Sequence, residues 1–136
     1  MSTSRMSNRS RRPLLVIHEN WGKLKARTAK VGDVCTAVYV LVQLIPAGFV
    51  SSYGDIAKVL GVSPRLVAWC LSRNKNLVVV PCHRVVYSNG ELGGYSGPGV
   101  EFKRKLLELE GVSLCGNRVS RGSFVSLHRL LCACTQ

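Results

Sequence analysis

A cysteine, a histidine and an arginine follow one another in the segment VPCHRVV at residues 80–86. Neighbouring positive charge lowers the pKa of a thiol and favours the thiolate, which is the nucleophilic form. Cys82 is therefore a candidate nucleophile. A Cys-His pair alone is weak evidence, because a buried cysteine is more often an inert core residue. Whether Cys82 is a nucleophile or an inert core residue depends on the elements that position this segment.

Two short helices precede the segment. Ser52 and Asp55 have the spacing of a capping box, at the start of a helix that Gly61 ends. Ser63 and Pro64 can then begin a second helix, which runs to about residue 73. Two short helices joined by a tight turn predict a helix-turn-helix.

The other elements are set by apolar spacing and by glycines. Apolar residues recur every three or four positions over residues 33–42, which predicts a helix, although the β-branched content leaves a strand possible. The apolar run 77–80 predicts a strand, and the glycines of 93–99 predict a loop. A last helix is predicted over residues 100–110, with Gly111 as its end. Its expected apolar face consists of Phe102, Leu106 and Leu109.

Length and composition limit the class of protein. The chain has 136 residues, 46% of them hydrophobic, which fits one domain and excludes wholesale disorder. Its net charge of +12 favours a polyanionic partner, nucleic acid first and an anionic membrane surface second. Without a membrane-length apolar run or a signal peptide, we expect a soluble intracellular protein in the cytoplasm (nucleoid) or the nucleus. The six irregularly spaced cysteines should then be mostly reduced.

Several blocks around Cys82 occur in an informative order. They are residues 45–57, 63–65, Asn74, 81–85, 93–97 and 106–111. Together they closely resemble the DNA-binding, active-site domain of the O6-alkylguanine-DNA alkyltransferases, also called methylated-DNA-protein-cysteine methyltransferases, over about residues 34–112. The resemblance implies a mostly α fold with a short strand element, a winged-helix-like helix-turn-helix whose usual N-terminal domain is largely missing. Residues 1–33 would be a basic arm or truncated N-terminal region, and 113–136 a tail of unknown role.

The resemblance also implies an activity. An alkyl group would pass from O6 of guanine in duplex DNA to Cys82, irreversibly and once per protein molecule, after the base is flipped out of the helix. His83 would relay a proton from Cys82 through water, and Glu110 would orient His83. Asn74 would tie the second helix to the active-site segment, although a structural turn is its alternative. No cofactor is needed, because the acceptor is the protein's own sulfur, and we expect a monomer.

Further residues are assigned to DNA and to the base by the same resemblance. Arg65 would enter the base stack as an arginine finger, and Tyr53 would help to rotate the phosphate and bind the guanine. Ser63 and Ala68 would contact the DNA. The base pocket would be lined by Val85, Tyr95, Ser96 and Lys103. A helix-surface arginine, a core tyrosine and a solvated lysine are the simpler interpretations of Arg65, Tyr53 and Lys103.

The chain departs from the family pattern in three places. Trp69 stands where the second helix usually has a glycine facing the minor groove, and the sequence leaves open whether it obstructs docking or turns into the core. Lys75 replaces the usual proline after Asn74. Only about 33 residues precede the matched region.

Other functions remain as alternatives. The related alkyltransferase-like proteins bind and flip alkylguanine without repairing it, but they replace the reactive cysteine, which this chain keeps as Cys82. A generic helix-turn-helix binding module would explain Arg65 and the charge, but not the other matching residues. The spacing of His128, Cys132 and Cys134 does not match a standard zinc site, so we predict no metal.

Overall fold

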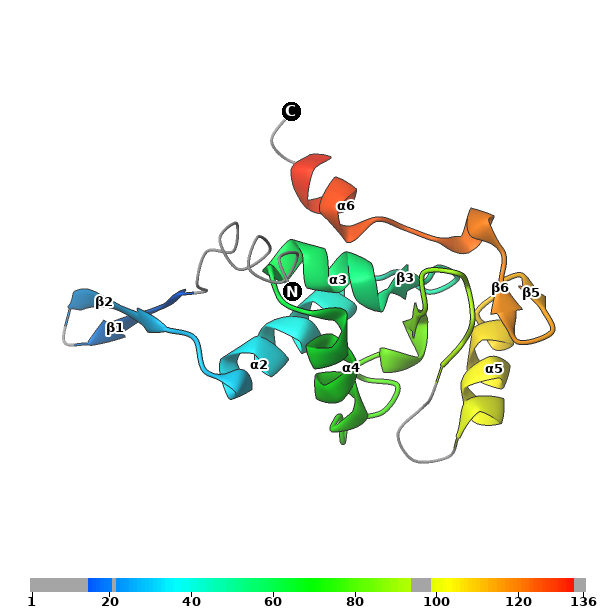
Figure 1. Ribbon diagram of the computed structural model, residues 1–136, viewed down its shortest axis with the longest axis horizontal. Coiled ribbons are helices and arrows are strands. Elements are labelled where there is room, and N and C mark those ends of the chain that lie inside the picture. Colours follow the sequence, from blue (N-terminus) through cyan, green and yellow to red (C-terminus); the bar gives the residue numbers. More distant parts are fainter. Residues whose placement is uncertain (1–14, 21, 94–98, 134–136) are drawn as a thin grey trace, which may run out of the picture.

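The computed structural model describes residues 15–20, 22–93 and 99–133, and the predicted basic arm at residues 1–13 lies outside this part of the chain (Figure 1). The helices are α2 (Val31–Val42), α3 (Tyr53–Leu60), α4 (Pro64–Ser72), α5 (Val100–Leu109) and α6 (Leu127–Ala133), with 3₁₀ turns η1 (Cys82–Arg84) and η2 (Arg121–Ser123). The strands are β1 (Leu15–Asn20), β2 (Lys23–Thr28), β3 (Ser51–Ser52), β4 (Val85–Val86), β5 (Leu114–Cys115) and β6 (Arg118–Val119).

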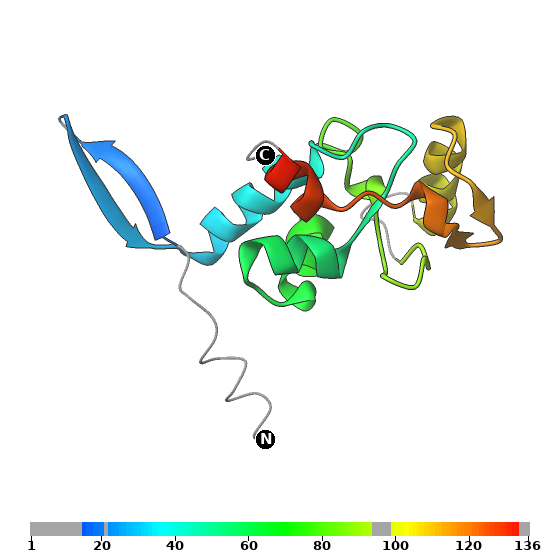
Figure 2. The same cartoon turned by 90° about the horizontal axis from the view of Figure 1, so that it is seen from above.

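The strands β1 and β2 form an antiparallel hairpin that projects away from the other elements (Figures 1 and 2). Leu15 and Leu24 on this hairpin are exposed. Arg27 connects the hairpin to the start of α2 by a 2.7 Å hydrogen bond to the carboxylate of Asp33. That bond, together with one from the Lys30 backbone, lowers the pKa of Asp33 to about 2. Part of the region expected as an arm is therefore a hairpin leading directly into a helix.

The core is built by α2, α3 and α4, which pack against one another. Val38, Ile56 and Val67, one from each helix, are fully buried together. A disulfide joins Cys35 of α2 to Cys70 of α4, and their Cα atoms lie 5.0 Å apart, within the range that a disulfide spans. The expectation of reduced cysteines is thus wrong for this pair, because helix packing brings together two residues that are distant in sequence.

The helix-turn-helix starts where the sequence predicts. The Ser52 hydroxyl accepts a hydrogen bond from the Asp55 backbone at 3.0 Å, and Gly61 ends α3 in the left-handed conformation, φ 71°. The Ser63 hydroxyl accepts from the Leu66 backbone at 3.2 Å at the start of α4. The carboxylate of Asp55 does not complete a capping box, because it accepts from the Ser51 hydroxyl and from the backbone N–H of Leu127.

The predicted strand at residues 77–80 is wrong. The segment is a turn, closed by a 2.9 Å hydrogen bond from the Val80 backbone to the Asn76 carbonyl. Val78 in this turn has φ 72°, which is rare for a β-branched residue. The short parallel pair lies instead between β3 and β4, with Ser51 opposite Val85.

The last predicted helix is confirmed as α5, and Gly111 follows it with φ 87°. The predicted apolar face is wrong, because Leu109 is 84% exposed and Phe102 42% exposed. The buried face instead consists of Lys103 and Leu107, which are one turn apart. Hydrogen bonds to the lysine ammonium, described below, make this burial possible.

Residues 114–133 pack onto the domain. The Val50 backbone donates to the Ser123 carbonyl at 2.9 Å and accepts from the Val125 backbone at 2.8 Å. Leu127 at the start of α6 is fully buried in the helical core, where α6 contacts α3. The stretch expected as a tail is therefore part of the fold over these residues. Among the described residues, none of the helices is long and apolar enough to cross a membrane.

Candidate active site

Cys82 begins the 3₁₀ turn η1, directly after the buried Pro81. Its backbone N–H donates to the Val80 carbonyl at 2.7 Å, and the next residues lead into β4. The Cys82 side chain is buried and is not part of the disulfide. A substrate can reach this sulfur only by entering the protein.

Asn74 joins the end of the helix-turn-helix to this thiol. Its side-chain N–H group donates to Sγ of Cys82 at 3.4 Å and to the Val80 carbonyl at 3.1 Å. Its Oδ1 accepts from the Asn76 backbone at 2.9 Å. Because all three bonds come from one buried side chain, Asn74 shapes the turn and also places a donor on the sulfur. A donor to sulfur favours the thiolate over the thiol.

Glu110, at the end of α5, is held from two sides. Its Oε2 lies 3.1 Å from Nε2 of the fully buried His83. Arg84 binds both carboxylate oxygens, at 3.0 and 2.6 Å, and also donates to the Ile45 carbonyl at 2.7 Å. This fork fixes the carboxylate that orients the His83 ring.

These contacts shift the pKa values of both partners. Burial lowers the pKa of His83, and the opposing effect of Glu110 is smaller. Burial alone would raise the pKa of Glu110, but the hydrogen bonds from Arg84 and His83 outweigh it and lower the pKa. The pair therefore consists of a neutral imidazole and a carboxylate near pH 7, and a neutral imidazole can accept a proton.

Lys103 is a buried cation beside the same turn. Its ammonium donates to the Val85 carbonyl at 2.7 Å and to the Leu92 carbonyl. Burial lowers the pKa of Lys103 to about 8, against a smaller opposing effect of Cys82. The solvated-lysine interpretation is thus wrong, and a positive charge lies near the thiol at neutral pH.

Tyr53 lies between this buried cluster and an open cavity. Its ring is 5.8 Å from the Lys103 ammonium and 5.3 Å, centroid to centroid, from the ring of Tyr87. Burial raises the pKa of Tyr53 to about 12, with Tyr87 and Cys82 adding to the effect. A side chain at Gly93 would approach the Tyr87 ring to 2.9 Å and the Tyr53 hydroxyl to 3.3 Å, so a glycine there keeps this space open.

The cavity has a volume of about 430 Å³. It is lined by Tyr53, Gly54, Pro64, Arg65, Ala68, Tyr87 and Ser88. Three predicted DNA-contacting residues, Tyr53, Arg65 and Ala68, therefore meet at one opening, and Tyr53 in its wall also interacts electrostatically with Cys82. Ser63 caps α4 next to it. Of the predicted base-pocket residues, Val85 and Lys103 do not line this cavity, and Tyr95 and Ser96 lie outside the described part of the chain.

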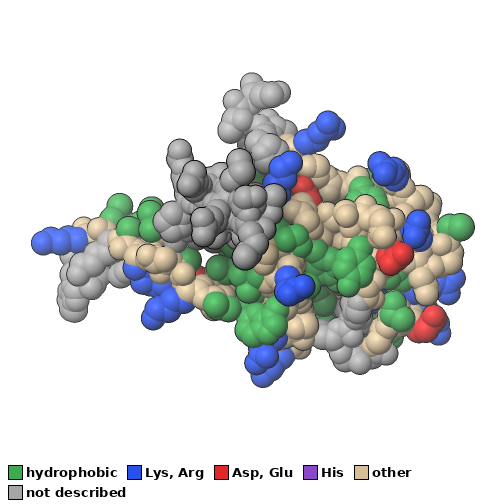
Figure 3. All heavy atoms as spheres, in the orientation of Figure 1, with side chains coloured by type: hydrophobic (Ala, Val, Ile, Leu, Met, Phe, Trp, Pro, Cys, Tyr) green, Lys and Arg blue, Asp and Glu red, His purple; other side chains and the backbone are tan. Residues whose placement is uncertain are grey.

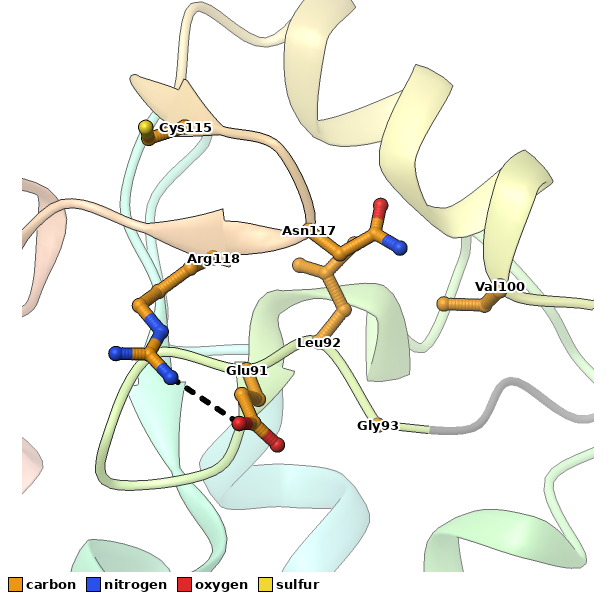
Figure 4. A pocket seen from close by; sticks show the side chains of 7 residues that line it. All are labelled: Glu91, Leu92, Gly93, Val100, Cys115, Asn117 and Arg118. Carbon is orange, nitrogen blue, oxygen red and sulfur yellow. Dashed lines mark hydrogen bonds and ion pairs between the residues drawn. The ribbon is translucent and has the colours of Figure 1, made fainter.

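A second cavity of about 420 Å³ lies between α5 and the β5–β6 hairpin (Figure 4). Glu91 and Arg118 point toward one another across its edge and form a 3.1 Å ion pair. Its other lining residues are Leu92, Gly93, Val100, Cys115 and Asn117. None of the predicted site residues lines it, whereas three of them line the first cavity.

Sequence reasoning missed several of these roles. Tyr87 and Ser88 line the cavity only because they follow β4, and their sequence carries no pattern that would single them out. The sequence did carry a signal for the ion pair between Arg84 and Glu110. Arg84 is adjacent to a predicted catalytic histidine, and a buried arginine needs a carboxylate partner. Among described residues there is no group of three side chains able to hold a metal, and the side chains of His128, Cys132 and Cys134 lie outside that description.

The fold combines a buried cysteine, a histidine–carboxylate pair and a helix-turn-helix whose second helix lines a cavity, an arrangement that fits a DNA-binding domain with a nucleophilic cysteine. Residues 33–112 match the family described as 6-O-methylguanine DNA methyltransferase, DNA binding domain. The chain belongs to this family, as its resemblance predicts.

Curated relatives agree with this assignment. The methylated-DNA–protein-cysteine methyltransferase of Pyrobaculum aerophilum is 56% identical over 77 residues, and that of Metallosphaera sedula is 58% identical over 74. These matches cover 57% and 54% of this chain, and 51% and 46% of the relatives. The chain thus spans about half the length of the curated relatives that it matches.

Solved structures agree on the fold. The O6-methylguanine-DNA methyltransferase of Pyrococcus kodakaraensis is 47% identical, with a TM-score of 0.54, over 57% of this chain and 46% of that one. The Schizosaccharomyces pombe protein Atl1, solved with damaged DNA containing O6-carboxymethylguanine, is 31% identical, with a TM-score of 0.58, over 64% of this chain and 83% of that one. The helix-turn-helix fold of the alkyltransferase C-terminal domain is therefore confirmed.

Proposed function

We propose that the chain repairs DNA by transferring an alkyl group from O6 of guanine to Sγ of its own Cys82. The observation that carries this proposal is the buried thiol of Cys82, which accepts a hydrogen bond from Asn74 and is followed in the chain by His83 of the His83–Glu110 pair. Relatives named methylated-DNA–protein-cysteine methyltransferase support the same chemistry. The substrate would be duplex DNA, found in the cytoplasm (nucleoid) or the nucleus.

The transfer is a single displacement. The Cys82 thiol loses its proton to the His83 ring through water, and the thiolate attacks the alkyl carbon. An S–C bond forms, the C–O bond to guanine breaks, and its electron pair remains on O6. A proton then restores guanine, and a thioether remains on Cys82. No step regenerates the thiol, so each molecule acts once.

Access to the thiol requires base flipping. The O6 atom of a stacked guanine cannot reach a buried sulfur, so the nucleotide must rotate out of the duplex. The cavity lined by Tyr53, Arg65 and Ala68 is the entrance that the fold offers. Arg65 would fill the space that the base leaves, and Tyr53 would turn the base toward Cys82. Lys103 supplies a positive charge that favours the thiolate.

The experiment is a mass measurement with two cysteine variants. The protein is incubated with a duplex that contains one O6-methylguanine, and its Cys82 peptide is weighed. We expect the mass of one added methylene, which Cys82→Ala abolishes and Cys115→Ala, at the exposed free cysteine, does not. An unmodified duplex should leave both proteins unchanged. A Cys82 peptide that stays unmodified while the lesion duplex is bound tightly would refute transfer.

A second candidate follows from one comparison. Atl1, solved with DNA containing O6-carboxymethylguanine, is matched over 83% of its length. The second candidate function is therefore binding of such a lesion without transfer to Cys82. We favour transfer, because Cys82 and its contacts with Asn74 are present. Lesion-selective binding without modification of Cys82 would instead favour this second function.

A further inference from the structure

The structure shows that Trp69 does not turn into the core. Arg65, Trp69 and Arg73 lie four residues apart along α4 and its C-terminal end, so their side chains share one helix face. All three are exposed, and Trp69 retains 46% of its accessible surface. The opposite face of α4, with Val67 and Cys70, is buried against the core.

Two contacts restrict this exposed tryptophan, one to its side chain and one to its helix. The Arg73 guanidinium lies 4.9 Å from the centroid of the indole, in cation–π contact. The next residue, Cys70, is joined to α2 by the disulfide. Ordering a large apolar side chain at the surface lowers the entropic cost of using it in binding.

The charge around Trp69 matches a polyanion. There is no aspartate or glutamate between Asp55 and Glu91, whereas five lysines and arginines lie in that interval. Figure 3 shows hydrophobic side chains next to Lys or Arg side chains on the surface over α4. An aromatic ring set among cations is the arrangement by which proteins stack on nucleic-acid bases.

We propose that Trp69 is a second DNA-stacking residue, which inserts against the bases about two steps from the position of Arg65. This inference rests on the proposed function, because it requires α4 to dock on DNA. Four residues of α-helix rise about 6 Å, and successive bases are about 3.4 Å apart. Arg65 and Trp69 can therefore reach separate base steps of one groove, where apolar wedges open the stack.

The alternative is that the indole only obstructs docking. The two possibilities predict opposite effects of shortening the side chain. If Trp69 stacks on bases, Trp69→Ala weakens binding on the order of 10-fold or more, and Trp69→Phe restores most of the affinity. If it obstructs, Trp69→Ala binds as tightly as the original protein or more tightly.

The experiment measures binding to a short duplex, with and without O6-methylguanine, at several salt concentrations. We expect Trp69→Ala to weaken binding without changing the salt dependence, because an indole neutralises no phosphate. Arg73→Gln should reduce the slope against log salt by about one unit. Val40→Ala, at an exposed apolar residue of α2, is the control and should bind normally. Thermal unfolding verifies that each variant is folded.

A second measurement reports on Trp69 directly. The chain contains two tryptophans, so in a Trp21→Phe background the fluorescence comes from Trp69. We expect DNA to quench it, as base stacking does. Two results would overturn this inference alone, provided that Cys82 of the unsubstituted protein is still methylated. One is fluorescence that DNA leaves unchanged, and the other is binding of Trp69→Ala that is unchanged or tighter. If the unsubstituted protein neither binds the duplex nor becomes methylated, the proposed function fails together with it.

Discussion

Reducing the disulfide between Cys35 and Cys70 should lower the stability of the fold substantially. The two cysteines are 35 residues apart. In the chain-entropy description, a crosslink of this length limits the unfolded chain enough to stabilise the native state by about 4 kcal/mol. For a chain of this size, such a loss lowers Tm on the order of 10 °C.

The assay is thermal unfolding with and without a thiol reductant. The protein should melt at a clearly lower temperature in reductant, whereas Cys35→Ala/Cys70→Ala should melt at one temperature under both conditions. The difference in Tm between the reduced protein and the double variant measures what the packing of the two sulfur atoms contributes. The effect of reductant on the unsubstituted protein measures what the crosslink contributes. A peptide map without reduction should recover the two cysteines in one bridged fragment.

Either of two results would refute this reasoning. The first is a Tm that reductant does not change, and the second is recovery of Cys35 and Cys70 as separate, alkylatable thiols. Disulfides are rare in reducing compartments, with intracellular proteins of hyperthermophiles as an exception.

Three other substitutions test the candidate active site and the attachment of α6 to the domain. Glu110→Gln should slow alkyl transfer about 100-fold. Because the pKa of Glu110 is lowered in the fold, the stability it contributes is present above its unfolded pKa and is lost in acid. The stability difference between the unsubstituted protein and Glu110→Gln should therefore shrink as the pH falls through that lowered pKa. Burial lowers the pKa of Lys103 from its ordinary 10.5 to about 8 in the fold, so the unfolded chain binds more protons between these values. Stability relative to Lys103→Met should therefore rise from pH 8 to 10, by at most about 3 kcal/mol, in urea unfolding. Asp55→Asn, which weakens the bond to Leu127, should cost about 2 kcal/mol and speed hydrogen exchange in α6 but not in α5.

The elements that the sequence predicts best are those fixed by neighbouring residues. Ser63 and Pro64 begin α4 as expected, because a cap and a first-turn proline act on the backbone within one turn. Gly61 ends α3 for the same reason. The residues of the active site could be placed by their resemblance to a family, and the structure brings Asn74 and Cys82 together.

The failures come from contacts between distant segments. The apolar run at residues 77–80 resembles a strand, but the side chain of Asn74 binds the backbone at both ends of the run and folds it into a turn. The simpler, solvated interpretation of Lys103 fails for the same reason, because the ammonium is buried against carbonyls of Val85 and Leu92 on another segment. The residues adjacent to Lys103 in the sequence give no indication of hydrogen-bond acceptors on another segment.

Asn74 also couples the two halves of the proposed mechanism. It follows Arg73 directly at the end of α4, and its side chain reaches the sulfur of Cys82. DNA would meet Arg65 and Trp69 on the exposed face of α4. A displacement of α4 by DNA would therefore move Asn74, and with it the hydrogen bond from Asn74 to Cys82 that favours the thiolate. The disulfide at Cys70 holds the other face of the same helix against α2, which limits how far α4 can move. Substitutions in α4 should for this reason change DNA binding and the reactivity of Cys82 together. A substitution of Glu110 should change the reactivity of Cys82 without changing DNA binding.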